Sequence, residues 1–236
     1  MIEFAGIAFH GLTLDDVFSE RDGLTQIVTV NAEYIVRANE DECFGRIVNK
    51  GIAVFDGQVP YLVARWKYKH RRFDKISGSE LVYHICERAA RRGERVFLLG
   101  GFADSNARSV DRLRAQYPGL VIDGCSPALR PYPFPQDHDQ SILDWVGRYR
   151  PHYLLVGFGA MKQDLWINDH RRELERMGVK LAIGVDGTFE MVSGKLTRAP
   201  RIVQRLGLEG VYRFAKEPKW FRLKRLLLSV RFLKYV

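Results

Sequence analysis

Residues 96–116 read VFLLGGFADSNARSVDRLRAQ: an apolar run, two glycines, and a longer polar stretch. A short run of apolar and β-branched residues bounded by glycine is typical of a buried strand. The stretch 104–116 is typical of a helix. The segment therefore predicts a strand that turns at Gly100-Gly101 into a helix, which is the repeating unit of parallel sheets.

The same alternation recurs on both sides of this segment. We expect strands at 26–30, 52–55, 96–99, 120–122, 153–156 and 181–185. We expect helices at 32–49, 59–70, 79–92, 104–116, 139–149 and 163–177. This order predicts an α/β fold with a Rossmann-like, largely parallel sheet flanked by helices. The alternation stops after Gly194, so we expect a catalytic domain at 1–194 and a basic helical C-terminal appendage at 195–236.

Composition narrows the class of protein. Hydrophobic residues make up 46% and charged residues 28% of 236 residues, which excludes a disordered chain, a collagen and a polytopic membrane protein. The three cysteines form no CxxC pair, so neither a disulfide framework nor a zinc ribbon is expected. The start lacks the basic region of a signal peptide, and no apolar window is long enough to span a bilayer. We expect a cytoplasmic protein.

The charge is unevenly distributed along the chain. Residues 1–194 hold 25 Lys and Arg against 26 Asp and Glu, whereas residues 195–236 hold 12 against 2. The basic residues of the tail alternate with large apolar ones, as in KWFRLKRLLL at 219–228. This pattern predicts reversible docking on an anionic membrane surface. A solvated helix that aids solubility, and a non-enzymatic module that binds membranes or nucleic acid, are the alternatives.

In open α/β sheets, ligands bind beyond the carboxyl ends of the strands, so the polar residues and glycines there are candidates. They are Thr29, Asn31, Asp56, Gly57, Gly100, Gly101, Gly159, Asp186 and Gly187. Asp56 directly follows the strand IAVF, where partial burial would suit a general base. A turn aspartate in a DG pair explains the same residue equally well.

Two strand-to-helix turns suit anions. Backbone N–H groups after Gly100-Gly101 could hold a phosphate. Glycines that only form the turn between the strand and the helix explain the sequence equally well. A nucleotide-dependent oxidoreductase using this loop is an alternative, but the pattern is not GxGxxG. Lys162 suits an anion, and Gln163 can hydrogen-bond sugar hydroxyls. The triplet Asp137-His138-Asp139 is placed in the Pro-rich loop that begins at 127, so no metal site is expected.

Taken together, these motifs resemble the WecG/TagA/CpsF family of bacterial glycosyltransferases, glycosyltransferase family 26. The resemblance covers nearly the whole chain. It rests on TVN at 29–31, FDG at 55–57, ISGSEL at 76–81, VFLLGG at 96–101, QYPGL at 116–120, VGFGAMKQD at 156–164, GVDGTFEMVSG at 184–194, RAP at 198–200 and GLEGVYRFAKEP at 207–218.

The resemblance implies inverting, metal-independent transfer of a sugar from a UDP-sugar to a polyprenyl-diphosphate-linked acceptor, at the inner face of the cell membrane, in polysaccharide or cell-wall polymer synthesis. It implies no cofactor and no nucleic-acid partner, and it leaves a homo-oligomer open. Asp56 matches the family's proposed base, Thr29 and Asn31 match polar residues beside the reacting centre, and Gln163 matches a motif glutamine. Arg198 and Arg213 fall in the C-terminal appendage, which resembles the family's mobile cover over the active site and its diphosphate, and Arg222 is a further substrate-binding candidate there.

Several positions differ from the family pattern. Met161 and Asp164 flank Lys162-Gln163 where the family has proline and glutamate, and Lys75 and Asp186 replace arginine and glycine. N-acetylmannosamine, its uronic acid, glucose and glucuronic acid all remain open as the donor sugar. Lys75 or Lys162 could pair with a uronate.

Overall fold

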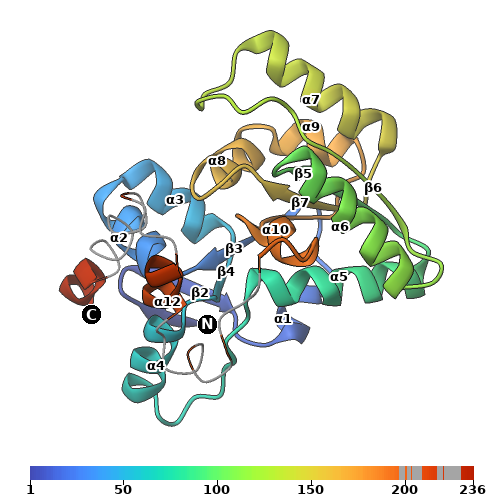
Figure 1. The fold of residues 1–236 in the computed structure, drawn as a ribbon. Helices are drawn as coiled ribbons and strands as arrows, with labels where there is room; N and C mark the ends of the chain where they lie inside the picture. Colours follow the sequence, from blue (N-terminus) through green and yellow to red (C-terminus); the bar gives the residue numbers. More distant parts are fainter. Residues whose placement is uncertain (197–199, 201–202, 204–208, 217–219, 221–229) are drawn as a thin grey trace. The chain divides into compact units, whose positions relative to one another are not determined.

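The computed structural model describes residues 1–196, 200, 203, 209–216, 220 and 230–236 (Figure 1). Its strands form a sheet in the order β1-β2-β4-β3-β8-β7-β5-β6. The strands are β1 (Ile2–Phe4), β2 (Ile7–Gly11), β3 (Thr25–Val30), β4 (Ile52–Phe55), β5 (Arg95–Gly100), β6 (Val121–Cys125), β7 (Tyr153–Gly157) and β8 (Leu181–Gly184). The β1–β2 pair is antiparallel, and the pairs β2–β4, β3–β8, β8–β7, β7–β5 and β5–β6 are parallel. The predicted α/β class is confirmed.

The chain divides into two compact units, and the division falls inside β3. Unit 1 comprises residues 1–19, 28–77 and 198–236, and unit 2 comprises residues 20–27 and 78–197. The helices of unit 1 are α1 (Leu14–Phe18), α2 (Ala32–Glu40), α3 (Glu42–Lys50), α4 (Gln58–Lys67), α12 (Glu209–Lys216) and the 3-10 helix η1 (Phe232–Tyr235). Those of unit 2 are α5 (Gly78–Arg92), α6 (Ala103–Gln116), α7 (Gln136–Tyr149), α8 (Lys162–Asp169), α9 (Arg171–Arg176) and α10 (Thr188–Val192).

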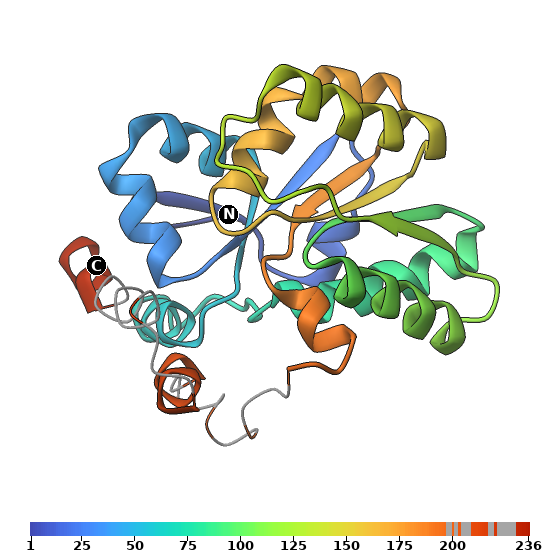
Figure 2. The same ribbon diagram turned by 45° about the horizontal axis from the view of Figure 1, so that its top comes forward.

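The core of unit 2 is built on strands that are buried on both faces. Every residue of β7 and β8 is buried, as expected for parallel strands covered by helices. Leu154, Val156 and Ala182 pack in one cluster with Ile142 of α7 and Trp166 of α8. Figure 2 shows α7, α8 and α9 on one side of these strands, with α5, α6 and α10 on the other. This double cover fixes the strands whose ends carry the candidate turns.

Unit 1 has an aromatic core of its own. Phe9 of β2 and Phe55 of β4 are stacked with ring centroids 3.7 Å apart, and Phe73 lies 5.1 Å from Phe55. Phe4 of β1 lies 6.0 Å from Phe55. Such pairs add stability beyond the burial of their area. The cluster fixes the end of β4, one residue before Asp56.

Several sequence expectations need correction. The predicted helix 32–49 is two helices, because Asp41 ends α2 and caps α3 through its side chain and the Phe44 N–H. The predicted helix 163–177 is likewise divided at His170. The strands β1 and β2 were not predicted. Residues 137–139 lie in the first turn of α7 and not in a loop.

The C-terminal region is described in part. Helix α12 and η1 lie in it, and the side chain of Phe232 is buried. Arg231 and Tyr235 both hydrogen-bond Glu40 of α2, which ties η1 to the body of unit 1. The boundary predicted near 195 stays a prediction. Within the described ranges, the chain has no helix with the length and apolar character needed to cross a bilayer.

Candidate functional site

The turn after β4 is tied to the end of β3 within unit 1. The backbone N–H groups of Asp56 and Gly57 both donate to the carbonyl of Val30, at 3.0 and 3.3 Å. The side chain of Asp56 is half-buried, at the edge of a buried strand. The register therefore places a carboxylate directly beside the residues that follow β3.

Asn31 and Thr29 belong to the same edge. Asn31 is the N-cap of α2, and its Oδ1 accepts a hydrogen bond from the Tyr34 N–H at 3.1 Å. A Cβ added to Gly57 would lie 3.1 Å from the Asn31 Cα, so the two turns are in close contact. Thr29 is 7% exposed, one residue before the end of β3. The structure thus brings together Thr29, Asn31, Asp56 and Gly57.

A backbone hydrogen bond holds the segment that contains Lys75 at this edge of the sheet. The N–H of Ile76 donates to the carbonyl of Phe55 at 2.8 Å, and Lys75 itself is half-buried. The segment around Lys75 is therefore pinned beside the residue that precedes Asp56. A cation at this position suits an anionic group of a substrate.

In unit 2, the carboxyl ends of the strands are lined by glycine. Strands β5, β7 and β8 end at Gly100, Gly157 and Gly184. Gly100 and Gly101 have φ angles of +94° and +70°, and the N–H of Gly101 donates to the Gly157 carbonyl at 2.9 Å. A Cβ on Gly100 would lie 2.9 Å from that carbonyl oxygen, so a side chain does not fit there. The glycines allow neighbouring groups to pack closely at this edge, so Gly100, Gly157 and Gly184 are buried and Gly101 is half-buried.

The start of α6 already carries a carboxylate. Its N-cap, Phe102, makes no side-chain cap, and Asp104 lies in the first turn. Asp104 forms ion pairs with Arg108 at 2.8 Å and Lys195 at 2.5 Å. An acid near a helix N-terminus is itself stabilised by the helix dipole. A phosphate at the Gly100-Gly101 turn would therefore share this helix end with Asp104.

Gln163 is a buried support and not an exposed contact. Its side chain is fully buried, and its Oε1 accepts a hydrogen bond from the Asp186 N–H at 3.1 Å. It packs so closely on Gly184 that a Cβ there would lie 2.6 Å from the Gln163 Cδ. Asp186 has a φ of +46°, which a non-glycine residue rarely adopts. Gln163 thus holds the turn that contains Asp186 and Gly187.

The neighbours of this turn are more accessible. Lys162 is exposed at the first residue of α8, and Gly187 is exposed at the N-cap of α10. Gly159, with a φ of +92°, has open space where a Cβ would stand. Glu190 was not among the predicted site residues. Its Oε2 is buried, has no hydrogen-bond partner among the described residues, and would lie 3.3 Å from a Cβ on Gly187. Its position in the first turn after Gly187 was the available signal.

Three predicted residues cannot be placed in a site. Arg198 and Arg222 lie outside the described residues, and Arg213 belongs to α12. Their roles stay predictions.

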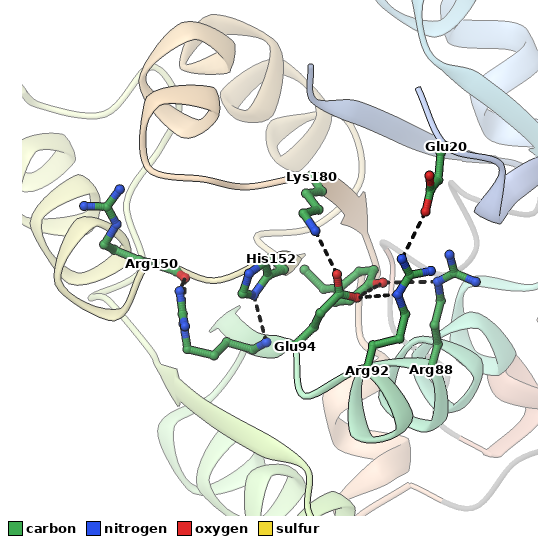
Figure 3. Close-up of polar contacts among 9 residues, drawn as sticks. Glu20, Arg88, Arg92, Glu94, Arg150, His152 and Lys180 are labelled. Carbon is green, nitrogen blue, oxygen red and sulfur yellow. Dashed lines mark hydrogen bonds and ion pairs between the residues drawn. The ribbon is translucent and has the colours of Figure 1, made fainter. Parts of the chain in front are cut away.

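A cluster of charged and polar side chains lies at the opposite, amino ends of the unit 2 strands (Figure 3). Glu94 accepts hydrogen bonds from Lys180 Nζ at 2.8 Å and from the Tyr153 hydroxyl at 2.6 Å, and Arg92 Nε lies 3.6 Å away. Burial by itself raises the pKa of Glu94, but these hydrogen bonds and nearby cations outweigh burial and hold the pKa below its usual value. Burial and Glu94 together raise the pKa of Tyr153 to about 12. Because these groups satisfy one another, the cluster has the character of a structural support.

Other reactive groups are also engaged or inert. Asp139 accepts a hydrogen bond from Trp166 Nε1 at 2.6 Å and pairs with His170 Nε2 at 2.7 Å, so it ties α7 to α8. Burial raises the pKa of the Cys86 and Cys125 thiols to about 12, which makes both poor nucleophiles at neutral pH. Among the described residues, no group of three or more His, Cys, Asp or Glu side chains could hold a metal ion.

A family comparison identifies the class of enzyme to which these turns belong. The profile of the glycosyl transferase WecG/TagA/CpsF family matches residues 2–236. The chain therefore belongs to the WecG/TagA/CpsF family of glycosyltransferases. The resemblance inferred from the motifs is confirmed. Family membership assigns the chain to glycosyl transfer in the synthesis of cell-wall polymers and polysaccharides.

A similarity to a solved structure adds nothing to this family assignment. The crystal structure of RecJ in complex with Mn2+ from Thermus thermophilus is 16% identical and aligns over 69% of this chain with a TM-score of 0.28. The glycosyltransferase chain covers 22% of that protein. A likeness at this level carries no argument about fold or activity.

Proposed function

We propose that this glycosyltransferase moves a sugar from a UDP-sugar to a polyprenyl-diphosphate-linked acceptor, with inversion at the anomeric carbon. The donor sugar is of the N-acetylmannosamine, glucosyl or glucuronosyl type. The observation that supports the proposal is a half-buried carboxylate, Asp56, held beside Asn31 and Thr29 at a strand edge, in a chain matched by the family over residues 2–236.

Asp56 is the proposed general base. An acceptor hydroxyl has a pKa far above neutral, so a carboxylate in hydrogen-bond reach is needed to take its proton as the new bond forms. In a single displacement, the acceptor oxygen bonds the anomeric carbon while the bond from that carbon to the diphosphate oxygen breaks. The proton passes to Asp56, and UDP leaves with the electron pair. Attack from the face opposite the leaving group inverts the anomeric configuration.

Cationic side chains are proposed to stabilise the departing UDP. The leaving diphosphate gains negative charge, so cations near it stabilise the transition state more than the ground state. We assign this role to Arg198, Arg213 and Arg222, whose guanidinium groups suit phosphate oxygens, in place of a divalent metal. The glycine turns of unit 2 and the exposed Lys162 are proposed to bind the nucleotide part of the donor. Lys75 is proposed to contact an anionic group of a substrate.

The proposed location follows from the acceptor. A lipid-linked acceptor restricts the enzyme to the membrane surface, and we propose the inner face of the cell membrane with the basic tail as a docking element. UDP-sugars are then supplied from the cytoplasm. A homo-oligomer is compatible with this arrangement.

The variant Asp56→Asn tests the proposal. It keeps the shape of the side chain but cannot take a proton, so we expect turnover to fall by roughly a thousandfold while UDP binding is retained. UDP release with a panel of UDP-sugars and a lipid-diphosphate acceptor measures turnover, and calorimetry measures UDP binding. Asp74→Asn, at an exposed acid of the same unit, is the matched control. Wild-type turnover in Asp56→Asn would remove Asp56 as the base, and tight nicotinamide binding would favour an oxidoreductase.

A further inference from the structure

Helix α4 of unit 1 exposes an apolar stripe beside a basic turn. Val59, Leu62 and Trp66 are 40%, 47% and 72% exposed, and their spacing of three and four residues places them on one face of the helix. The opposite side of α4 is buried through Pro60 and Ala64. A tryptophan exposed to this extent next to two aliphatic side chains is a feature of interaction surfaces.

The turn that follows α4 is strongly basic. Residues 65–75 include six Lys or Arg and a single Asp, although residues 1–194 as a whole are nearly neutral. Four of these cations are exposed and form no ion pair with another described residue; they are Lys67, Lys69, Arg71 and Arg72. Together with Val59, Leu62 and Trp66 we call them the α4 surface.

Backbone and side-chain contacts hold the basic turn in place. Arg65 Nη1 donates to the Arg71 carbonyl at 3.1 Å, and its guanidinium lies 5.6 Å from the centre of the Phe73 ring. The Tyr68 hydroxyl donates to the Glu3 carbonyl. Lys69 Nζ lies 5.8 Å from the centre of the Trp66 ring. The cations are therefore kept at the end of the apolar stripe.

We propose that the α4 surface docks on an anionic phospholipid bilayer. In this arrangement Leu62 and Trp66 enter the interface between headgroups and acyl chains, and the four cations meet lipid phosphates. Tryptophan is favoured at this depth because its ring is apolar and its N–H is polar. The inference goes beyond the docking expected of the C-terminal tail. It is also independent of sugar transfer, since binding is measured without substrates.

The charge of the surface argues for lipid over the other partners. A symmetric contact between two copies would bring the same cationic turn of each chain together, and like charges repel. Nucleic acid would satisfy the cations and could stack on Trp66, but it leaves Val59 and Leu62 without an apolar partner. An anionic bilayer offers acyl chains to the apolar side chains of the surface and phosphates to its cations.

Vesicle binding by the full-length protein tests the proposal. Co-sedimentation with vesicles of phosphatidylglycerol and phosphatidylcholine is compared for wild type, Leu62→Ser/Trp66→Ser and Lys69→Ala/Arg72→Ala. We expect each double variant to lower the partition coefficient by roughly tenfold, and salt to weaken the wild type. The matched control is Trp145→Ser/Arg148→Ala, which changes a partly exposed tryptophan and an exposed arginine on α7. It should bind as wild type does.

A second measurement reports on Trp66 directly. Brominated acyl chains quench tryptophan fluorescence on contact, so quenching should be smaller in Trp66→Phe than in wild type. Because the changed residues are exposed, circular dichroism should show unaltered folding. Equal vesicle binding by wild type and both double variants would overturn the proposal. So would equal binding to pure phosphatidylcholine, or variants that lose self-association or oligonucleotide binding while vesicle binding is kept.

Discussion

The two ends of the central strands of unit 2 are built from opposite kinds of residue. Strands β5, β7 and β8 are preceded by Glu94, His152 and Lys180, and each of the three ends at a glycine. At the amino ends, Glu94 accepts hydrogen bonds from the side chains of Lys180 and Tyr153, and His152 accepts one from the Arg95 N–H (Figure 3). At the carboxyl ends, the strand glycines are buried and allow close packing by neighbouring groups, such as the Gln163 side chain on Gly184.

From this difference we expect the amino ends of the strands to contribute to stability and the carboxyl ends to contribute to function as well. A cluster whose members satisfy one another has little left to offer a ligand, so its changes should alter folding and not turnover. The turns that follow the glycine ends include the exposed Lys162 and Gly187 and are proposed to bind the donor, so changes there should alter both. Turnover in the following predictions is UDP release under the proposed reaction.

The largest effect is expected at Gly184. In Gly184→Ala the new Cβ would lie 2.6 Å from the Cδ of the buried Gln163, so either the strand or the glutamine has to move. We expect the free energy of unfolding to fall by about 3 kcal/mol, with loss of turnover, because overpacked cores are strained. Denaturant titration measures the free energy of unfolding, and UDP release measures turnover. The control is Gly147→Ala in α7, where the nearest atom is 3.5 Å away and alanine favours the helix.

A smaller loss is expected when the Asp186 turn loses its acceptor. Gln163→Leu fills the same space but leaves the Asp186 N–H without the Oε1 that accepts from it. Removing the acceptor from a partly buried donor costs about 1–2 kcal/mol, and turnover should fall more than stability explains. Comparison of turnover per folded molecule with unfolding free energy separates the two effects. Gln140→Leu, at an exposed glutamine of α7, should change neither. Normal turnover in Gln163→Leu would show that this turn has no part in catalysis.

Changes in the Glu94 cluster at the amino ends should lower the free energy of unfolding and leave turnover per folded molecule unchanged. We expect Glu94→Gln to lower the free energy of unfolding by about 1 kcal/mol at neutral pH, a modest value because its partner Lys180 is 61% exposed. Since the pKa of Glu94 is lowered in the folded state, its contribution is present above the unfolded pKa and is lost as pH falls through the folded pKa. Wild type and variant should therefore converge in acid. Glu87→Gln, at a more exposed ion pair, serves as the control.

The sequence was most informative about the strands buried on both faces. The apolar runs at 153–156 and 181–185 are continuous, so β7 and β8 were predicted almost to the residue. Strands β1 and β2 were missed because they are short and lack a continuous apolar run: their residues alternate between buried and more exposed positions. The division at Asp41 was hidden because the aspartate that ends one helix also caps the next.

The sequence predicted those site residues whose positions follow from the strand directly before them, but not the contacts between residues far apart in the chain. Asp56 and Asn31 each follow a predicted strand, and parallel register brings such ends together. The burial of Gln163 was not predictable, because its partner is a backbone N–H twenty-three residues away. The Glu94 cluster depends on Lys180, which only the pairing of β8 with β7 brings near.

The smallest effect is expected at His152, and it sharpens the contrast between the two strand ends. Its Nδ1 accepts a hydrogen bond from the Arg95 N–H at 3.0 Å, which requires an unprotonated Nδ1. Burial and the charge of Arg95 lower the pKa of His152, so its stabilising contribution is present above the unfolded pKa and declines as pH falls below it. Denaturant titrations in mildly acidic and neutral buffer should show this slope in wild type and a flatter one in His152→Asn, whose side-chain oxygen keeps the acceptor without titrating. Turnover per folded molecule should be equal in the two proteins at neutral pH. A change in turnover there would mean that the amino ends take part in catalysis after all.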